Sequence, residues 1–122
     1  MKHYAYFFTR QDISPEQQVV QTAHAAFQLG VNSQRWIDNP PANQQVHADV
    51  KAEETYFTVV GVRNLDGLNA VQKILDKFHI KYEVFFEPDL NNGENTSIAV
   101  YPIQEDKRDI LLAFNLLSIG RR

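Results

Sequence analysis

A strand pattern passes directly into a helix pattern within the first thirty residues, and this transition constrains the fold more than any other feature. Residues 3–9 form a continuous aromatic and apolar run, which is typical of a strand buried on both faces. Residues 14–17 (Ser-Pro-Glu-Gln) then supply a serine N-cap, a proline in the first helical position and a glutamine that completes a capping box. We expect this helix to run from Pro15 to about Leu29 and to stop at Gly30, which can take the left-handed conformation of a helix end.

One stripe of the first helix is apolar at helical spacing and is predicted to face the sheet. Its alanines would allow the helix to approach the strands closely. The stripe consists of Val19, Val20, Ala23, Ala26 and Phe27.

Further apolar runs predict strands at 55–62, 81–86 and 97–101, a second helix opened by an Asp66 N-cap and a last helix at about 105–117. This βαβαββα order predicts one α/β domain over residues 1–122. We expect a three-layer sandwich in which helices cover both faces of a mixed four-stranded sheet.

The helical periodicity disappears between residues 31 and 50, where Pro40-Pro41 excludes a continuous helix. Trp36 and Ile37 are the obvious anchors there, and a short helix at 33–38 is one alternative. The segment is otherwise interpreted as a flexible connection, with a lid over a functional site as the other alternative.

Composition excludes several classes of function. The chain has 122 residues and no cysteine, which excludes disulfides, a thiolate nucleophile and cysteine-ligated metals. The histidines and carboxylates show no metal-binding spacing, so no metal site is predicted. The net charge of −3 argues against broad nonspecific binding to nucleic acid.

The absence of a long apolar stretch in the sequence and the lack of cysteine lead us to expect a cytoplasmic protein that does not contact membranes. A homodimer is expected only because dimers are common among soluble proteins.

A polar segment, residues 87–97, separates the third and fourth predicted strands. It carries carboxylates, amides, hydroxyls and a glycine, and at roughly ten residues it exceeds the usual hairpin connection. Long ordered loops on a rigid scaffold often carry function, so this segment is the first candidate for a site.

Three motifs, taken in order, resemble the type 2 peptidyl-tRNA hydrolase family. Residues 9–13 (TRQDI) are similar to the family's turn after the first strand, and residues 19–26 (VVQTAHAA) resemble its first helix. Residues 96–99 (TSIA) are similar to its last strand. The resemblance spans nearly the whole chain and includes the spacing between the motifs.

The resemblance implies hydrolysis of the ester that joins a peptide to the 3′ ribose of tRNA, without a metal or an organic cofactor. It assigns catalysis to Asp89 and Thr96. Asp89 lies seven residues before Thr96, where the family usually has about four, and Gln17 occupies the place of the family's lysine. A neutral amide cannot supply the charge that an ammonium group brings to a phosphate or an oxyanion.

Five further residues are candidates for substrate binding. Arg10 follows the first strand and is a spatial substitute for the missing lysine, whereas His24 is either a structural histidine or part of the site edge. Asp89 and Asn92 also have a simpler explanation in turn chemistry. The binding candidates are Arg10, Gln17, Gln21, His24 and Asn92.

These residues leave three functions open. The first is a peptidyl-tRNA ester hydrolase. The second is a catalytically silent module of the same fold that binds a nucleotide or a tRNA end. The third is a self-associating or partner-binding protein whose interface is the aromatic surface near Trp36.

Overall fold

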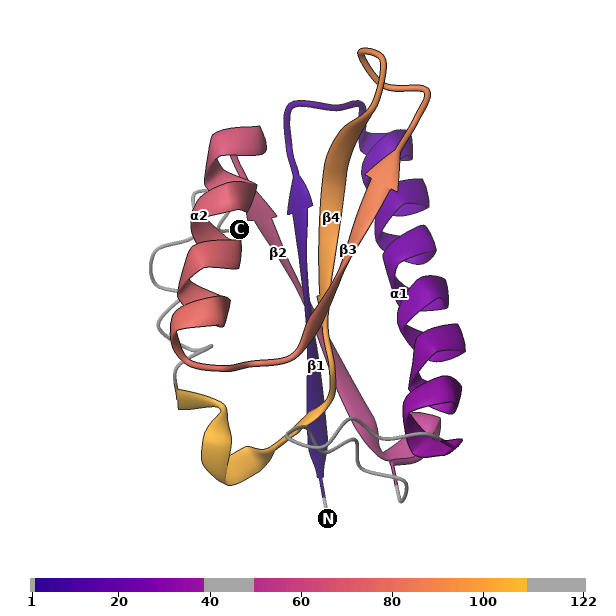
Figure 1. The fold of residues 1–122 in the computed structure, drawn as a ribbon, viewed down its shortest axis with the longest axis vertical. Coiled ribbons are helices and arrows are strands. Elements are labelled where there is room, and N and C mark those ends of the chain that lie inside the picture. The colour runs from indigo at the N-terminus through magenta and orange to yellow at the C-terminus, as the bar shows by residue number, and fades with distance from the viewer. Residues whose placement is uncertain (1, 39–49, 110–122) are drawn as a thin grey trace.

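The computed structural model describes residues 2–38 and 50–109, in which strands and helices alternate along most of the chain (Figure 1). The long elements are β1 (His3–Arg10), α1 (Pro15–Asp38), β2 (Thr55–Val62), α2 (Leu65–Lys77), β3 (Tyr82–Glu87) and β4 (Glu94–Val100). Three short elements complete the described chain, namely β5 (Ile103–Gln104) and the 3-10 helices η1 (Ala52–Glu54) and η2 (Glu105–Lys107).

The strands form one mixed sheet in the order β2-β1-β4-β3. β1 pairs in parallel with β2 and antiparallel with β4, and β3 pairs antiparallel with β4. β5, which the sequence did not predict, also pairs with β1 and follows β4 after Pro102, a residue that cannot donate a backbone hydrogen bond. The predicted α/β class and mixed sheet are therefore confirmed.

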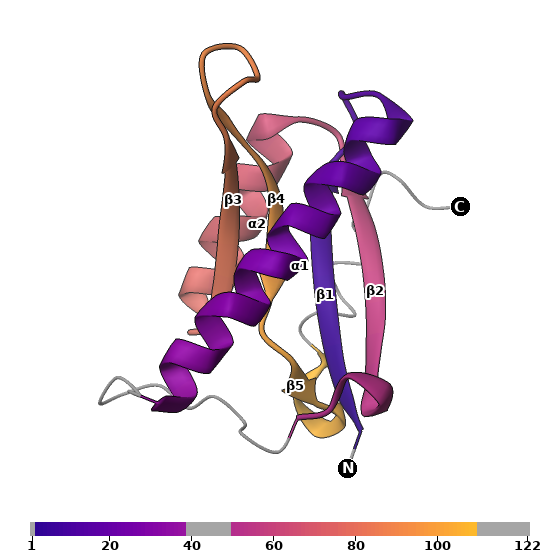
Figure 2. The same cartoon turned by 90° about the vertical axis from the view of Figure 1, so that its right-hand side faces the viewer.

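The two long helices cover opposite faces of this sheet (Figures 1 and 2). On the α2 face, Tyr6, Phe8 and Ile98 pack with Leu68 and Leu75 into the larger core cluster. The smaller cluster lies under α1 and consists of Ala5, Phe7, Ala25 and Ala99. The predicted last helix at about 105–117 begins as η2, and its residues 110–117 lie outside the described part.

The prediction that the first helix stops near Leu29 is wrong, because α1 continues through Gly30 to Asp38. No residue after Gly30 breaks a helix until Pro40-Pro41, and the residue before a proline disfavours helical geometry. Residues 31–38, expected in a connection or a separate short helix, are the last turns of α1. Residues 39–49 of the segment interpreted as a flexible connection or a lid lie outside the described part.

The prediction that the apolar stripe of α1 faces the sheet is also wrong. Val19 is 71% exposed and Phe27 is 75% exposed, whereas Gln21 and Ala25 are buried against the strands. The sheet-facing side of α1 is mostly polar and is held by hydrogen bonds. Of the predicted stripe, Val19, Val20, Ala23 and Phe27 are exposed, whereas Ala26 packs against the smaller core cluster as predicted.

The start of α2 differs by two residues from the prediction. Its N-cap is Asn64, whose Oδ1 accepts a hydrogen bond from the Gly67 backbone N–H at 3.1 Å, and Asp66 lies in the first turn. The predicted inward positions Leu68 and Val71 are buried, as is Leu75.

The connection between β3 and β4 is shorter than predicted, because Glu87 pairs with Glu94 and leaves only residues 88–93 in the turn. Asn91, Asn92 and Gly93 all have positive φ, at 48°, 66° and 111°. Asparagine and glycine tolerate this conformation better than other residues do. The hairpin projects beyond the end of the sheet (Figures 1 and 2).

Within the described residues, no helix combines the length and the apolar character that crossing a membrane requires.

Candidate functional site

A β-bulge in β4 determines where Thr96 points. Phe85 pairs with Ser97 and Phe86 pairs with Asn95, so Thr96 is an extra residue without a partner on β3. Bulges of this kind re-aim side chains. As a result, Thr96 and Ser97, which are consecutive in the sequence, both direct their hydroxyls toward the α1 face.

Thr96 is fully buried and is connected through Gln21 to Glu87, in an arrangement that we call the Thr96–Gln21–Glu87 chain. The Thr96 hydroxyl donates to Gln21 Oε1 at 2.8 Å. The Gln21 side-chain N–H group donates to Glu87 Oε1 at 2.9 Å and to Gln17 Oε1 at 3.1 Å. Helix α1 and both strands of the β3–β4 hairpin therefore meet at one buried amide.

Glu87, which the sequence analysis did not select, is the carboxylate at the outer end of this chain. The hydrogen bond from Gln21, together with a weaker one from the Asp89 backbone N–H, holds the pKa of Glu87 below its ordinary value. His24 lies close enough to lower this pKa slightly further through its charge. Glu87 is therefore ionised at neutral pH and is a hydrogen-bond acceptor.

Asp89 and Asn92 lie on the exposed hairpin rather than beside Thr96. Asp89 joins the chain through its backbone N–H, which donates to Glu87 Oε2 at 3.3 Å. Within the described residues, the Asp89 carboxylate makes no hydrogen bond or ion pair. Asn92 has the positive φ expected from turn chemistry. Their assignments to catalysis and to binding stay predictions.

His24 lies next to the chain on the same helix and is exposed. Its imidazole stacks on the ring of Phe85, with centroids 4.7 Å apart and planes inclined by 4°. This contact places the His24 ring beside the Thr96–Gln21–Glu87 chain. The assignment of His24 to a site edge or to a structural role stays a prediction.

A group of three hydroxyls continues the polar layer under α1. The Thr9 hydroxyl lies 2.6 Å from that of Thr22 and 2.8 Å from that of Ser97. The Thr22 hydroxyl in turn donates to the backbone carbonyl of Gln18 at 2.7 Å. These contacts fix the first turns of α1 on β1 and β4 and thereby position Gln17 and Gln21.

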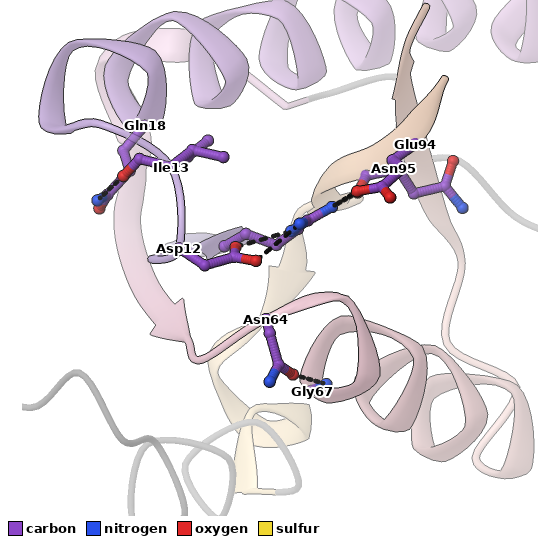
Figure 3. A network of polar contacts seen from close by, with 8 residues as sticks. Asp12, Ile13, Gln18, Asn64, Gly67, Glu94 and Asn95 are labelled. Atoms are coloured by element: carbon purple, nitrogen blue, oxygen red, sulfur yellow. Dashed lines mark hydrogen bonds and ion pairs between the residues drawn. The ribbon is translucent and has the colours of Figure 1, made fainter. Parts of the chain in front are cut away.

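Arg10, the proposed substitute for a lysine, is buried and bound to carboxylates. Its guanidinium donates to both Asp12 oxygens at 2.9 and 2.7 Å, to Glu94 at 2.7 Å and to the Asn95 carbonyl at 3.1 Å (Figure 3). The hydrogen bond with Asp12 is the largest influence that raises the pKa of Arg10 and lowers that of Asp12. The guanidinium charge is thus largely neutralised within the protein.

The same end of the molecule contains two helix starts. Gln18 Nε2 donates to the Ile13 carbonyl at 3.0 Å (Figure 3). Ser14 Oγ accepts from the Gln17 backbone N–H at 3.2 Å, as a serine N-cap should. The Asn64 cap of α2 is drawn in the same view (Figure 3). These caps fix the turns around the site.

The arrangement can bind and orient a polar ligand. Gln17 and His24 are exposed and offer an amide and an imidazole, and the ionised Glu87 can accept a proton or a hydrogen bond. Thr96 is buried and orients Gln21 in this geometry. The described residues contain no group of three His, Asp or Glu side chains that could hold a metal ion.

Neither the protein-family models nor the curated proteins searched include a match to this chain. The structure itself defines the class: an α/β domain with a hydrogen-bonded amide–carboxylate cluster under its first helix.

The sequence contained a signal for Glu87 that only the alternation of β3 could reveal. Glu83, Phe85 and Glu87 occur at every second position and share the face covered by α1. Their partners on the helix are amides: Gln28 and Asn32 both donate to Glu83 Oε1, at 2.9 and 2.8 Å. A strand with alternating carboxylates opposite an amide-rich helix predicts this contact pattern.

Proposed function

We propose that the protein is a peptidyl-tRNA ester hydrolase of the type 2 kind, with its site at the outer end of the Thr96–Gln21–Glu87 chain. The observation that carries the proposal is the hydrogen bond between Thr96 and Gln21. These residues belong to two of the three motifs on which the family resemblance rests, and they are 75 residues apart in the sequence.

In this proposal a carboxylate accepts a proton from water, and the water oxygen attacks the ester carbonyl to give a tetrahedral intermediate. The bond to the 3′ oxygen of the ribose then breaks, and that oxygen takes up the proton that the carboxylate accepted, which restores the ionised carboxylate. Glu87 and Asp89 are the two candidate carboxylates. Two hydrogen bonds fix the position of Glu87, but the same bonds lower its pKa and make it a weaker base, whereas the Asp89 carboxylate accepts no hydrogen bond within the described residues.

The test is hydrolysis of a defined peptidyl-tRNA by the purified chain and by Glu87→Gln, Asp89→Asn and Thr96→Val variants. We expect turnover to fall by about a hundredfold or more when the base is removed. Asp66→Asn, an exposed carboxylate on α2, is the control and should retain full turnover. Folded wild-type protein without turnover above buffer contradicts the proposal.

A second function, a catalytically silent module that binds a nucleotide or a tRNA end, has its own support. Gln17 replaces the expected lysine, and the charge of Arg10 is engaged by Asp12 and Glu94. A site without a free ammonium group supplies little stabilisation to a developing oxyanion.

Titration of tRNA and free nucleotides at several salt concentrations tests this second function. Binding that weakens with salt, in the absence of turnover, would support it, because phosphate contacts release counterions. Absence of binding at low salt would contradict it.

A further inference from the structure

The outward face of α1 is unusual for a helix exposed to water. It carries an outer stripe, defined here as Val19, Val20, Ala23, Phe27, Gly30 and Val31. All six residues are exposed. Surface helices normally direct charged residues outward and apolar residues toward the core, whereas the outward side of α1 is apolar and its sheet-facing side carries several uncharged polar residues.

Charge is also missing from the whole middle of this helix. Residues 17–34 contain no Asp, Glu, Lys or Arg, although 22% of the chain is charged and about four such residues would be expected in eighteen. Depletion of charged residues together with exposed aromatic side chains is the compositional mark of the centre of a protein interface.

The neighbouring edge of the sheet adds to this surface. α1 leaves β2 uncovered on the same face of the molecule (Figure 2). Phe57 and Val59 on β2 pair with Ala5 and Phe7 on β1, whose side chains lie under α1, and are therefore directed to that face. They are 64% and 61% exposed. An edge strand with exposed apolar side chains is a further feature that proteins usually cover.

Gly30 gives an independent reason to expect a covering partner. It lies inside α1, has no positive φ, and a Cβ added to it would meet nothing within 4 Å. Glycine is the poorest helix former after proline, and no contact within the described chain requires it here. A closely approaching second helix would require a residue without a side chain at this position.

We infer that the outer stripe of α1, together with Phe57 and Val59, is the interface with a second copy of this chain. Phe27 protrudes, and Gly30 leaves open space three residues along the same helix. In an antiparallel pair of α1 helices related by a two-fold axis, Phe27 of each copy meets Gly30 of the other. Such self-complementarity is the requirement of a two-fold interface.

The exposed apolar area and the net charge of the chain agree with a second copy as the partner. The stripe and the two β2 residues expose on the order of 600 Å² per copy, and about 1,200 Å² in a pair is the lower limit for a specific interface. Two copies that each carry a net charge of −3 associate best through an uncharged face. A membrane-binding helix would instead carry lysine or arginine beside its apolar face, and residues 17–34 contain neither.

The experiment is sedimentation equilibrium of the full chain from about 1 to 100 µM. We expect a dimer that Phe27→Asp dissociates, with the dissociation constant raised about thirtyfold or more and the circular dichroism unchanged. Phe78→Asp is the matched control, because Phe78 is 46% exposed at the end of α2 on the opposite face, and this variant should remain dimeric.

The Gly30→Ala variant distinguishes an effect on the dimer interface from an effect on the stability of α1. At low concentration, where both proteins are monomers, the alanine should raise Tm by about 5 °C, because it favours the helix. At high concentration it should weaken the dimer about tenfold, because its methyl group displaces the partner's Phe27.

Four results would overturn the inference. The first is a wild-type chain that stays monomeric at the highest concentration. The second is a dimer that Phe27→Asp and Phe78→Asp affect equally. The third is a monomer whose Tm falls in Phe27→Asp, which would show that the chain covers the stripe itself. The fourth is a monomer that binds phosphatidylcholine vesicles through Phe27, which would assign the stripe to a lipid surface.

Discussion

The side chain of Gln21 accepts a hydrogen bond from the hydroxyl of Thr96 at 2.8 Å, and both residues are buried. This single contact joins α1 to the bulged part of β4. The same amide donates to Glu87 and Gln17, so the position of the candidate site depends on how Gln21 is held.

Breaking the contact from either side should destabilise the fold. Gln21→Leu leaves the Thr96 hydroxyl buried without its acceptor, and Thr96→Val leaves the amide oxygen without its donor. We expect each change to lower the free energy of unfolding by about 1–3 kcal/mol. The double variant should lose at least about 1 kcal/mol less than the sum of the two.

Urea unfolding monitored by circular dichroism measures these values. Thr58→Val, at a half-buried threonine on β2, is the control and should change stability by less than about 0.5 kcal/mol. Strict additivity of Gln21→Leu and Thr96→Val would show that the two side chains do not interact in solution.

The ion pair between Arg10 and Asp12 should contribute a pH-dependent part of the stability. The Arg10 guanidinium lowers the pKa of Asp12 below 3.8, so this contribution is present above about pH 3.8 and is lost as the pH falls through the folded pKa. Asp12→Asn should therefore be less stable than the wild type at pH 7. The difference should shrink as the solution is acidified.

Thermal unfolding at pH 7, 5, 4 and 3 checks this prediction, with Asp66→Asn as the control that has no ion pair with Arg10. A stability difference between wild type and Asp12→Asn that is constant across this range would mean that the pair does not lower the pKa of Asp12.

Lys81 should affect stability at alkaline pH. Burial lowers its pKa from 10.5 to about 8, against a smaller opposing effect of Glu83. Between pH 8 and 10.5 the unfolded chain therefore holds more protons at this residue than the folded chain, so stability should rise with pH. Above pH 10 this gain is opposed, because the folded protein raises the pKa of Tyr82 to about 12.

Urea unfolding between pH 7.5 and 10 should show this rise in the wild type and its loss in Lys81→Met. Lys77→Met, at an exposed lysine 5.7 Å from the ring of Phe78, is the control and should preserve the rise. An equal rise of the free energy of unfolding in the wild type, Lys81→Met and Lys77→Met would show that groups other than Lys81 cause it.

The hairpin should not accept a side chain at Gly93. Its φ of 111° is unfavourable for other residues, and a Cβ there would overlap the ring of Phe86. We expect Gly93→Ala to lower the free energy of unfolding by more than about 1 kcal/mol.

Gly67→Ala is the matched control. Gly67 lies inside α2, and a Cβ there would meet the Val62 side chain at 3.5 Å, an ordinary van der Waals distance. It should leave stability unchanged or raise it by up to about 1 kcal/mol. Equal tolerance of both alanines in urea unfolding would show that the hairpin rearranges easily.

The sequence predicted the four long strands well, because runs of aromatic and β-branched residues such as 55–62 favour a strand over a helix or a loop. It predicted the sheet-facing side of α1 wrongly, because Val19 and Phe27 are apolar whether they contact their own sheet or another surface. Apolar periodicity identifies the face that is covered, but it does not identify what covers it.

The candidate site was predicted only in part for a second reason. Gln21 and Thr96 were identified through separate motifs, and their contact depends on a bulge that moves Thr96 to the other face of β4. A strict two-residue alternation would have directed it toward α2. Glu87 was missed because the alternation of carboxylates in β3 indicates a contact only once the amides of α1 are known to lie opposite it.

The polar underside of α1 also fixes the helix in one axial position. An apolar helix can slip along a sheet by one turn, about 5.4 Å, and find new apolar partners at modest cost. The same slip here would break the contacts of Thr22 with Thr9, Gln21 with Thr96, and Gln28 with the Val84 carbonyl together. These directional hydrogen bonds therefore prevent α1 from sliding along the sheet. A ligand or partner that pulls on this helix should either leave its position on the strands unchanged or detach it completely.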